Sequence, residues 1–176
     1  MDVGAGDGGY VYHRALREPT TFALAIDASP DALIDGAWKA KRSSLRNAAF
    51  LVEGIERIPA ALAGVADEVT VHFPWGSLLR GIRGADAAVM APLAGLLKPD
   101  GALRILLSAS AGDGYPDVRS RDIAGLADRY AAHGLRLIEA RDASPREIAA
   151  SRSSWAKRLA APMRRPVVFV RLVRGR

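Results

Sequence analysis

Short apolar runs alternate with stretches of helical periodicity along almost the whole chain, and no other feature limits the possible folds as much. The clearest run, Phe22–Ile26, ends at Asp27 and is followed by a predicted helix over Pro30–Lys41 with Ser29 as its N-cap. Strands separated by helices of this length predict an α/β fold with a doubly wound, mostly parallel sheet and helices on both faces. Further strands are expected at residues 49–52, 68–73, 103–107, 135–140 and 167–173, and a turn at 98–101. Further helices are expected near residue 10 and at 121–133 and 145–159, together with a short helix at 56–62 that is broken near Pro59 and a mostly helical stretch at 75–97 that is interrupted around Gly81 and Gly84.

The composition is that of a globular protein and excludes several classes. At 176 residues the chain fits a single domain, 1–176, and its opening residues lack the basic and apolar regions of a secretory signal. No apolar run approaches the ~18 residues of a membrane span, and there is no cysteine. We therefore expect no membrane association, no disulfide and a reducing cytoplasm. His13, His72 and His133 lack the spacing of metal ligands, so we expect no metal.

Positive charge is concentrated in the last fifth of the chain. Residues 141–176 hold ten basic and two acidic side chains, a net charge of +8, whereas residues 1–140 have a net charge of −2. A segment of this kind predicts docking onto a polyanion such as RNA. The alternative is a solvated surface in a protein that is rich in arginine.

The chain opens with a glycine-rich turn, Asp2-Val-Gly-Ala-Gly-Asp-Gly-Gly9, directly before a helical stretch that begins near Tyr10. Glycines permit positive φ and close approach of a ligand, and the helix end supplies free N–H donors. The spacing fits both the dinucleotide fingerprint and the acid-first pattern of S-adenosyl-L-methionine (SAM) methyltransferases. Asp2 favours SAM, because a carboxylate can accept the ligand's ammonium group, and Asp27 is placed to bind ribose in either case. A tight structural turn is the remaining alternative.

Two tryptophans stand in turn or polar contexts, where indoles often stack on flat ligands. Trp75 lies in Phe73-Pro-Trp-Gly-Ser77 at the carboxyl end of a predicted strand, the edge at which open α/β sheets bind ligands. Trp155 lies within the basic segment. Either indole can instead be a packing residue, which is what we expect of Trp38 on its helix.

Three motifs, in this order and at these separations, resemble the kanamycin–apramycin resistance methyltransferases, which modify N1 of adenine 1408 in the decoding site of 16S rRNA in the 30S subunit. The motifs are Asp-Val-Gly-Ala-Gly-Asp-Gly, Phe-Pro-Trp-Gly-Ser-Leu-Leu-Arg-Gly and Ser-Ser-Trp-Ala-Lys-Arg-Leu. The first is shared with many methyltransferases, whereas the other two are specific as a pair. The resemblance covers essentially the whole chain. It implies a class I SAM-dependent methyltransferase fold, Rossmann-like with a seven-stranded sheet, and an enzyme that confers aminoglycoside resistance.

The resemblance also implies roles for individual residues. The methionine end of SAM would be held by Asp2, Gly4 and Gly6, its ribose by Asp27, and its adenine would lie beside Ile55 and Glu56. Positions near the cofactor and the methyl-transfer cleft are matched by His72, Ser77 and Ser153. The flipped target adenine would be sandwiched by Trp75 and Trp155, and rRNA phosphates would be held by Arg158, Arg164 and Arg165. Of these, Trp75, Trp155 and Ser153 are the candidate catalytic residues.

The first strand departs from the family's pattern. The family's glycine motif follows a complete strand and an amino-terminal segment, whereas this chain begins at Met1-Asp2. Loss of three buried aliphatic side chains forfeits ~1.5–3 kcal/mol each, against a domain stability of roughly 5–15 kcal/mol. We therefore expect a truncated first strand, and tolerance of a short strand in this family is the alternative.

The implied reaction needs little acid–base chemistry. Adenine N1 has an in-plane lone pair at neutral pH and can attack the sulfonium methyl group of SAM without a general base. Catalysis is then expected to come from positioning, after the base has been extruded from its stack. Three other functions stay open: methylation of another RNA or a small molecule, nicotinamide-dependent oxidation, and ribosome binding without catalysis. We expect a monomer, because a large rigid substrate needs only one docking face.

Overall fold

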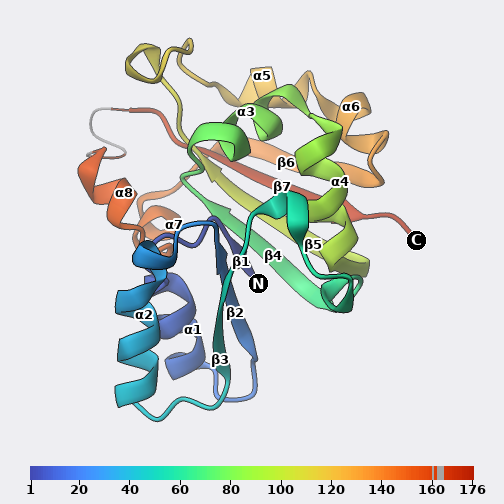
Figure 1. The fold of residues 1–176 in the computed structure, drawn as a ribbon. Coiled ribbons are helices and arrows are strands. Elements are labelled where there is room, and N and C mark those ends of the chain that lie inside the picture. Colours follow the sequence, from blue (N-terminus) through green and yellow to red (C-terminus); the bar gives the residue numbers. More distant parts are fainter. Residues whose placement is uncertain (160, 162–164) are drawn as a thin grey trace.

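Among residues 1–159, 161 and 165–176, which the computed structural model describes, seven strands form one sheet in the order β3-β2-β1-β4-β5-β7-β6 (Figure 1). Neighbouring strands are parallel from β3 to β5, whereas β7 is antiparallel to both β5 and β6. The predicted doubly wound, mostly parallel sheet is thus confirmed. The strands are β1 Asp2–Val3, β2 Ala23–Asp27, β3 Ala48–Val52, β4 Ala66–His72, β5 Leu97–Leu107, β6 Leu135–Asp142 and β7 Val168–Arg174.

Helices cover both faces of the sheet because the buried strands carry apolar side chains on both sides. In β2, Ala23 and Ala25 pack against α1 and α2, whereas Leu24 and Ile26 belong to the main core on the opposite face. Helices α3 to α6 cover that opposite face over β4 to β7 (Figure 1). The helices are α1 Gly9–Arg17, α2 Pro30–Arg42, α3 Gly76–Gly84, α4 Ala87–Leu96, α5 Ser120–Ala124, α6 Ala127–Ala131, α7 Pro145–Ala150 and α8 Ser154–Arg158.

The helix predicted at 30–41 is confirmed, with the Ser29 side chain accepting a hydrogen bond from Ala32 N. The helices predicted at 121–133 and 145–159 are wrong in their continuity, since each is divided in two, whereas the interruption predicted within 75–97 is confirmed. The 75–97 stretch breaks at Ala85, which has a φ of 46°, before Asp86 caps α4. The 145–159 stretch breaks at Arg152, which has a φ of 54°, before Ser153 caps α8.

Other differences are smaller and have local causes. The 121–133 stretch divides between α5 and α6 around Gly125. The break predicted near Pro59 is confirmed, but the 56–62 stretch forms two 3₁₀ turns, Ile55–Arg57 and Ala60–Leu62, in place of a short helix. The turn expected at 98–101 lies inside β5, at a register irregularity against β4.

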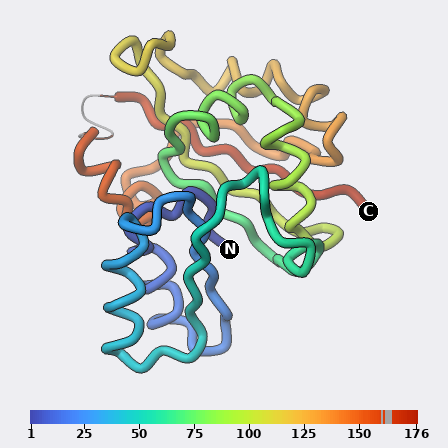
Figure 2. The backbone as a smooth tube through the Cα atoms, viewed as in Figure 1, coloured from blue at the N-terminus to red at the C-terminus, as the bar shows by residue number. Residues whose placement is uncertain are grey.

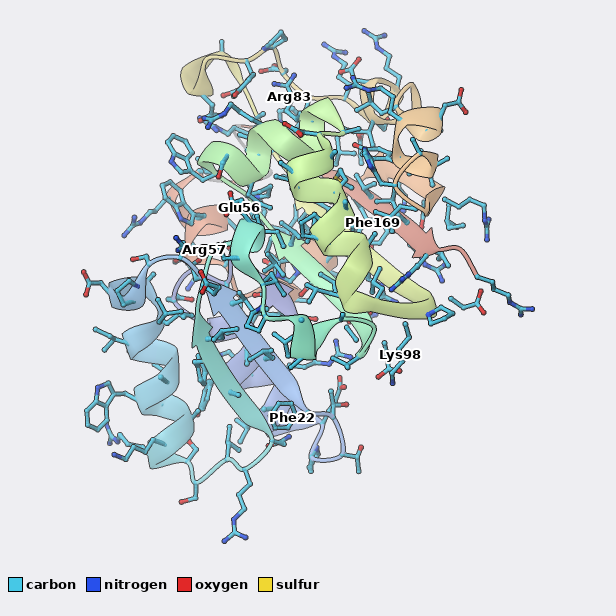
Figure 3. The ribbon with its side chains drawn as sticks, turned by 45° about the vertical axis from the view of Figure 1, so that its right-hand side comes forward. Phe22, Glu56, Arg57, Arg83, Lys98 and Phe169 are labelled. Atoms are coloured by element: carbon cyan, nitrogen blue, oxygen red, sulfur yellow. The ribbon has the colours of Figure 1, made fainter. Side chains whose placement is uncertain are left out.

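The first strand, β1, is two residues long and lies in the centre of the sheet. Asp2 and Val3 pair with Ala25 and Ile26 of β2, and Asp2 also pairs with Thr70 of β4. The amino terminus therefore lies between two sheet halves, while the carboxyl terminus lies at the end of β7 (Figure 2). A groove of about 620 Å³ continues from β1 between β2 and β4, down to Phe22 at the far end of β2 (Figure 3).

The prediction that Trp38 packs is wrong, since its side chain is 58% exposed. The buried face of α2 is made by Leu33, Gly36 and Ala40, and Trp38 lies off that face with Lys41 Nζ 5.2 Å from its ring centroid. No helix in the described part of the chain is long and apolar enough to cross a membrane. Over the same residues there is no cluster of three or more His, Asp or Glu side chains suited to a metal ion.

Candidate active site

A cleft of about 540 Å³ opens at the carboxyl ends of β1, β2, β3 and β4. Its walls come from four segments that are far apart in the sequence, which meet because parallel strands end at the same edge of a sheet. Figure 3 shows one wall, the 3₁₀ turn that carries Glu56 and Arg57, near the middle of the molecule and well above Phe22. The lining segments are Gly4 and Gly6 of the glycine loop, Asp27–Ser29, Glu53–Glu56 and Phe73–Leu78, with Trp155 at the mouth.

The glycine loop turns the backbone toward this cleft. Gly4, Gly6 and Gly8 have φ values of 68°, 55° and 67°, a region that L side chains rarely adopt. A Cβ at Gly4 would lie 2.8 Å from Leu78 Cδ2, whereas one at Gly6 would meet nothing within 4 Å. Gly6 therefore leaves backbone open to the cleft. Asp27 fixes this geometry, since its two carboxylate oxygens accept hydrogen bonds from Gly6 N (2.8 Å) and Ser29 N (2.9 Å).

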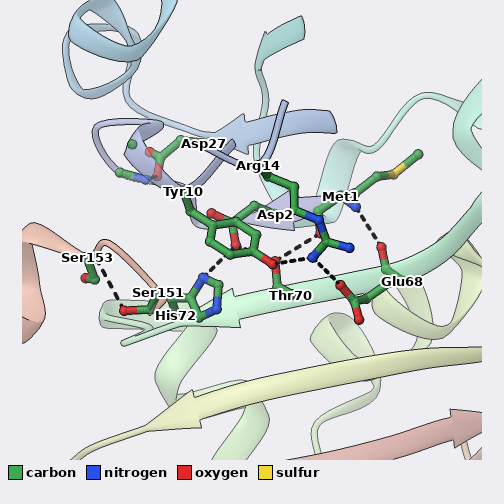
Figure 4. A network of polar contacts seen from close by, with 12 residues as sticks. Met1, Asp2, Tyr10, Arg14, Asp27, Glu68, Thr70, His72, Ser151 and Ser153 are labelled. Atoms are coloured by element: carbon green, nitrogen blue, oxygen red, sulfur yellow. Dashed lines mark hydrogen bonds and ion pairs between the residues drawn. The ribbon is translucent and has the colours of Figure 1, made fainter. Parts of the chain in front are cut away.

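A second, narrower pocket continues from the cleft past Gly4 and Gly6 to the base of β1. It is lined by Asp2, Tyr10 and His72 on one side and by residues 151–155 on the other. Asp2 is 2% exposed, and its Oδ1 accepts a hydrogen bond from Thr70 Oγ1 at 2.7 Å (Figure 4). The same oxygen lies 3.1 Å from His72 Nδ1. The cleft and the pocket form one continuous, bent site.

The charge of this site is predominantly negative. Five acidic residues line it, Asp2, Asp7, Asp27, Glu53 and Glu56, whereas Arg152 is the one arginine or lysine among the described residues that do so. SAM carries a sulfonium and an ammonium group, which such a site attracts. A dinucleotide carries a pyrophosphate, which it repels.

Trp75 is placed at the mouth of the cleft by a strained turn. Phe73, directly after β4, has a φ of 51°, an outlier for a bulky residue. Its ring is 4% exposed and belongs to a small apolar cluster with Leu106, Ile148, Ala156 and Val167. The buried ring holds the strained backbone in place, and the following turn leaves the Trp75 indole 59% exposed.

Trp155 comes to the same mouth from α8. Ser153 caps this helix through Ala156 N, and Ser151 Oγ bonds back to Ile148 O, which fixes the break between α7 and α8. The indoles of Trp75 and Trp155 stack with ring centroids 5.6 Å apart and planes inclined by 10°. Arg158 Cζ lies 5.5 Å from the Trp155 ring centroid on the outer side.

This indole pair has no room for a base in the present structure. A ring stacked between two others needs about 3.5–4.0 Å on each side, or roughly 7–8 Å between the outer planes. The predicted partners of a sandwich are therefore brought together, but in contact with each other.

Helix α7, which precedes the Trp155 segment, is anchored to β6 by an ion pair. Arg141 donates to both carboxylate oxygens of Glu147 at 2.9 and 2.6 Å. These hydrogen bonds from Arg141, together with those from Ser144 at the helix cap, lower the pKa of Glu147 to about 2. The carboxylate is therefore ionised at neutral pH and holds the start of α7 against the end of β6.

Several cations of the basic segment 141–176 are bonded within the protein. Arg165 is largely buried and pairs with Asp113 at 2.6 Å, Arg176 pairs with Asp100, and Arg174 donates to the carbonyl oxygens of Gly95 and Leu97. With Arg141, four of the nine cations that the structure describes in this segment are thus bonded within the protein. Arg158 lies exposed beside the indole pair, and Arg164 falls outside the described residues.

The structure brings together every cofactor and base candidate that the sequence singled out. Gly4, Gly6, Asp27, Ile55, Glu56, Trp75, Ser77 and Trp155 line the cleft, and Asp2, His72 and Ser153 line the adjoining pocket. Sequence reasoning missed Tyr10 and Glu53. Both had a detectable signal, since Tyr10 stands in the first turn after the glycine loop, where helix side chains point back toward the N-terminus, and Glu53 directly follows β3.

Comparison with known proteins identifies a consistent set of relatives. A family model described as NpmA: 16S rRNA (adenine(1408)-N(1))-methyltransferase matches residues 1–174. A relative with that enzyme name from Streptoalloteichus hindustanus is 34% identical over 172 residues, which are 90% of this chain and 79% of the relative. A mutant of the enzyme of that name from Catenulisporales acidiphilia has a TM-score of 0.86 at 30% identity, covering 99% of this chain and 86% of that one. Another mutant of it, with cosubstrate SAM, has a TM-score of 0.80 at 28% identity, covering 99% and 84%.

Proposed function

This chain belongs to the family of 16S rRNA (adenine(1408)-N(1))-methyltransferases, and from that premise we propose that its bent cleft binds SAM and directs methylation to N1 of adenine 1408 in the 30S subunit. The enzyme is SAM-dependent, and aminoglycoside resistance is the expected consequence for a cell that makes it. The assignments below follow from the geometry of the cleft.

SAM supplies an electrophilic methyl group when bound. Asp27, at the end of β2, would hold the ribose, and Ile55 and Glu56 would flank the adenine ring in the wide cleft. Gly6 offers open backbone, and Asp2 offers a carboxylate for the methionine end in the narrow pocket. The five acidic side chains match the two cationic groups of this cofactor.

The target base would enter between Trp75 and Trp155. Since the two rings are in contact, one of them has to move by about one ring thickness. Stacking on two indoles then stabilises the extruded base by roughly 1–3 kcal/mol for each face. Adenine N1 carries a free lone pair, so no side chain has to remove a proton, and the two tryptophans act by positioning. Ser153 would fix the approach of Trp155 as the cap of α8.

The rRNA backbone would be held beside the indole pair. Arg158 is the clearest candidate because it is exposed and lies on the outer face of Trp155. Arg165 is engaged with Asp113, so its contribution would be to hold the end of the α8 segment in place. We expect the protein to act as a monomer in the cytoplasm, where 30S subunits are assembled.

The observation that carries this proposal is the stacked tryptophan pair at the mouth of an acidic cleft. The test is incubation of purified 30S subunits with labelled SAM, followed by primer extension to map the modified nucleotide. We expect label in 16S rRNA and a stop at adenine 1408, with none in 50S subunits or with a Trp75→Ala/Trp155→Ala double variant. Binding to 30S without label would indicate a non-catalytic relative, and a stop elsewhere would indicate a different RNA target.

A second test concerns the cell. Methylation at the decoding site is expected to raise resistance to kanamycin and apramycin together. Unchanged sensitivity in cells that contain folded protein and methylated 30S subunits would refute the resistance role while leaving the enzymatic activity intact.

A further inference from the structure

Arg152 is a cation in a site that is otherwise acidic. It shares the walls of the cleft and the narrow pocket with five acidic side chains. Within the described part of the chain, its guanidinium forms no ion pair with any of them or with another acid. A cation at this place opposes the binding of a cationic ligand unless it contacts an anionic group of that ligand. SAM has one such group, the carboxylate of its methionine end.

The backbone holds Arg152 at the pocket in a strained turn. Its φ is 54°, a value that arginine rarely adopts. Strain of this kind persists only where the surrounding structure fixes it. Here Ser151 is 2% exposed and its Oγ donates to Ile148 O at 2.7 Å, while Ser153 N donates to the same Oγ at 3.3 Å (Figure 4). Both chain neighbours of Arg152 are therefore held in place.

The strained turn lies against the start of α1, next to the glycine loop. A Cβ at Gly9 would lie 3.7 Å from the carbonyl oxygen of Arg152, so the two backbones approach each other closely. The narrow pocket is lined by Arg152 from the turn between α7 and α8 and by Asp2 from β1. The carboxylate that we assign to the cofactor's ammonium group and an unpaired guanidinium thus line the same pocket from different elements.

Arg152 also lines a neighbouring groove of about 520 Å³, whose other basic residues are His13, Lys39 and Lys157. Burial and then the charge of Arg152 lower the pKa of His13, as expected beside a cation that no acid neutralises. Arg152 therefore stands between the cofactor pocket and a basic groove. A phosphate of the RNA in that groove is the ligand that competes with the cofactor carboxylate for this guanidinium.

We propose that Arg152 binds the carboxylate of the cofactor's methionine end, while Asp2 takes its ammonium group. The inference rests on the proposed SAM site. A guanidinium presents a planar fork of N–H donors that matches the two oxygens of a carboxylate. The narrow pocket then selects a ligand that carries the whole amino acid. A ligand without the carboxylate leaves Arg152 as an uncompensated positive charge near the ligand's own ammonium group.

The test is calorimetry of the whole protein with SAM and with decarboxylated SAM, which keeps the sulfonium and ammonium groups but lacks the carboxylate. Arg152→Gln should lower the affinity for SAM by roughly tenfold or more, as for a lost hydrogen bond between charged groups. It should leave the affinity for decarboxylated SAM unchanged or raise it, because a repulsive charge is removed. Arg152→Lys should keep part of the affinity for SAM. Arg146→Gln, exposed on α7 and outside both parts of the site, is the charge-matched control and should change neither affinity.

The outcomes separate this inference from the proposed function. A SAM affinity that is unchanged or higher in Arg152→Gln, or equal losses for both ligands, would overturn the role of Arg152 and leave the SAM site standing. A loss of 30S affinity with unchanged SAM affinity would overturn it in favour of the RNA groove. No binding of either ligand to the unaltered protein would overturn the SAM site itself. Should Arg152→Gln fail to fold, Arg152→Gly decides, because glycine adopts this φ without strain and also removes the charge.

Discussion

Trp75 and Trp155 stack on each other across the mouth of the cleft, with ring centroids 5.6 Å apart and planes 10° from parallel. Trp75 follows β4 and Trp155 lies in α8, so the contact joins two parts of the chain that are far apart in the sequence. Both are tied to one apolar cluster, through Phe73 and Ala156. The stacking role of each indole can therefore be tested with variants that keep this cluster intact.

Trp155→Ala should reduce methylation of 30S subunits by roughly 5–150-fold, because one stacking face worth ~1–3 kcal/mol is lost. Trp155→Phe keeps an aromatic face and should retain most of the activity. Label incorporation under single-turnover conditions measures both, and circular dichroism confirms that the variants are folded. Equal activity of a folded Trp155→Ala variant would contradict the stacking role.

Gly4→Ala and Gly6→Ala form a matched pair in the glycine loop. Both place an alanine at positive φ, which destabilises by about 1–2 kcal/mol. Gly4→Ala adds a clash with Leu78, so it should lose a further ~1–3 kcal/mol. Urea unfolding should therefore rank Gly4→Ala as the less stable, whereas Gly6→Ala, with its methyl group in the cleft, should weaken SAM binding in calorimetry. The reverse ranking in stability would refute this description of the loop.

Glu147→Gln should destabilise the protein at neutral pH and have progressively less effect in acid. The pKa of Glu147 in the folded protein is about 2, below the usual 4.5 of a glutamate, because Arg141 hydrogen-bonds to the carboxylate. A depressed folded pKa gives stability that is present above the unfolded pKa and is lost as the pH falls from about 4.5 to about 2. Melting temperatures of both proteins between neutral pH and about pH 2.5 measure this. Asp128→Asn, at an exposed position of α6, is the control. If the melting temperatures of Glu147→Gln and the unaltered protein differ by the same amount at every pH, the ion pair does not stabilise the fold.

Arg158→Glu should weaken binding to 30S subunits and lower the slope of log affinity against log salt by about 1, as expected for a lost phosphate contact. Arg176→Glu reverses the same charge near the carboxyl terminus, where the residue pairs with Asp100, and should change neither quantity. Filter binding at several salt concentrations gives both values. Equal losses in the two variants would point to net charge alone and against a local contact at Arg158.

The order of strands and helices was predictable because each strand is a short apolar run bounded by a polar residue or a turn. The cap at Ser29 followed from the same local rules, which depend only on neighbouring residues. The convergence of Asp2, Asp27 and Trp75 followed from the rule that parallel strands end at one sheet edge. The family resemblance supplied the specific partners.

The break at Arg152 was not predictable, and the interruption predicted around Gly81 and Gly84 has its positive φ at Ala85 instead, since neither Arg nor Ala favours positive φ. Ala85 is buried in the main core, and Phe73 is held by its buried ring. The exposure of Trp38 depends on the close approach of Gly36 to the backbone of the glycine loop, where a Cβ would lie 2.5 Å from Asp7 O. That contact rotates α2 so that its small residues face inward. The pairing of Arg165 with Asp113 likewise joins residues that no local pattern connects.

The stacked indoles also bear on which adenine compounds the enzyme would bind. On the proposed mode of binding, each indole covers the face of the other on which a nucleobase would stack, so a free nucleoside would have to displace this contact. The adenine of a docked ribosomal subunit meets the same cost of separating the indoles, but its high local concentration would offset that cost. We therefore expect the contact between the two indoles to disfavour binding of free adenine compounds.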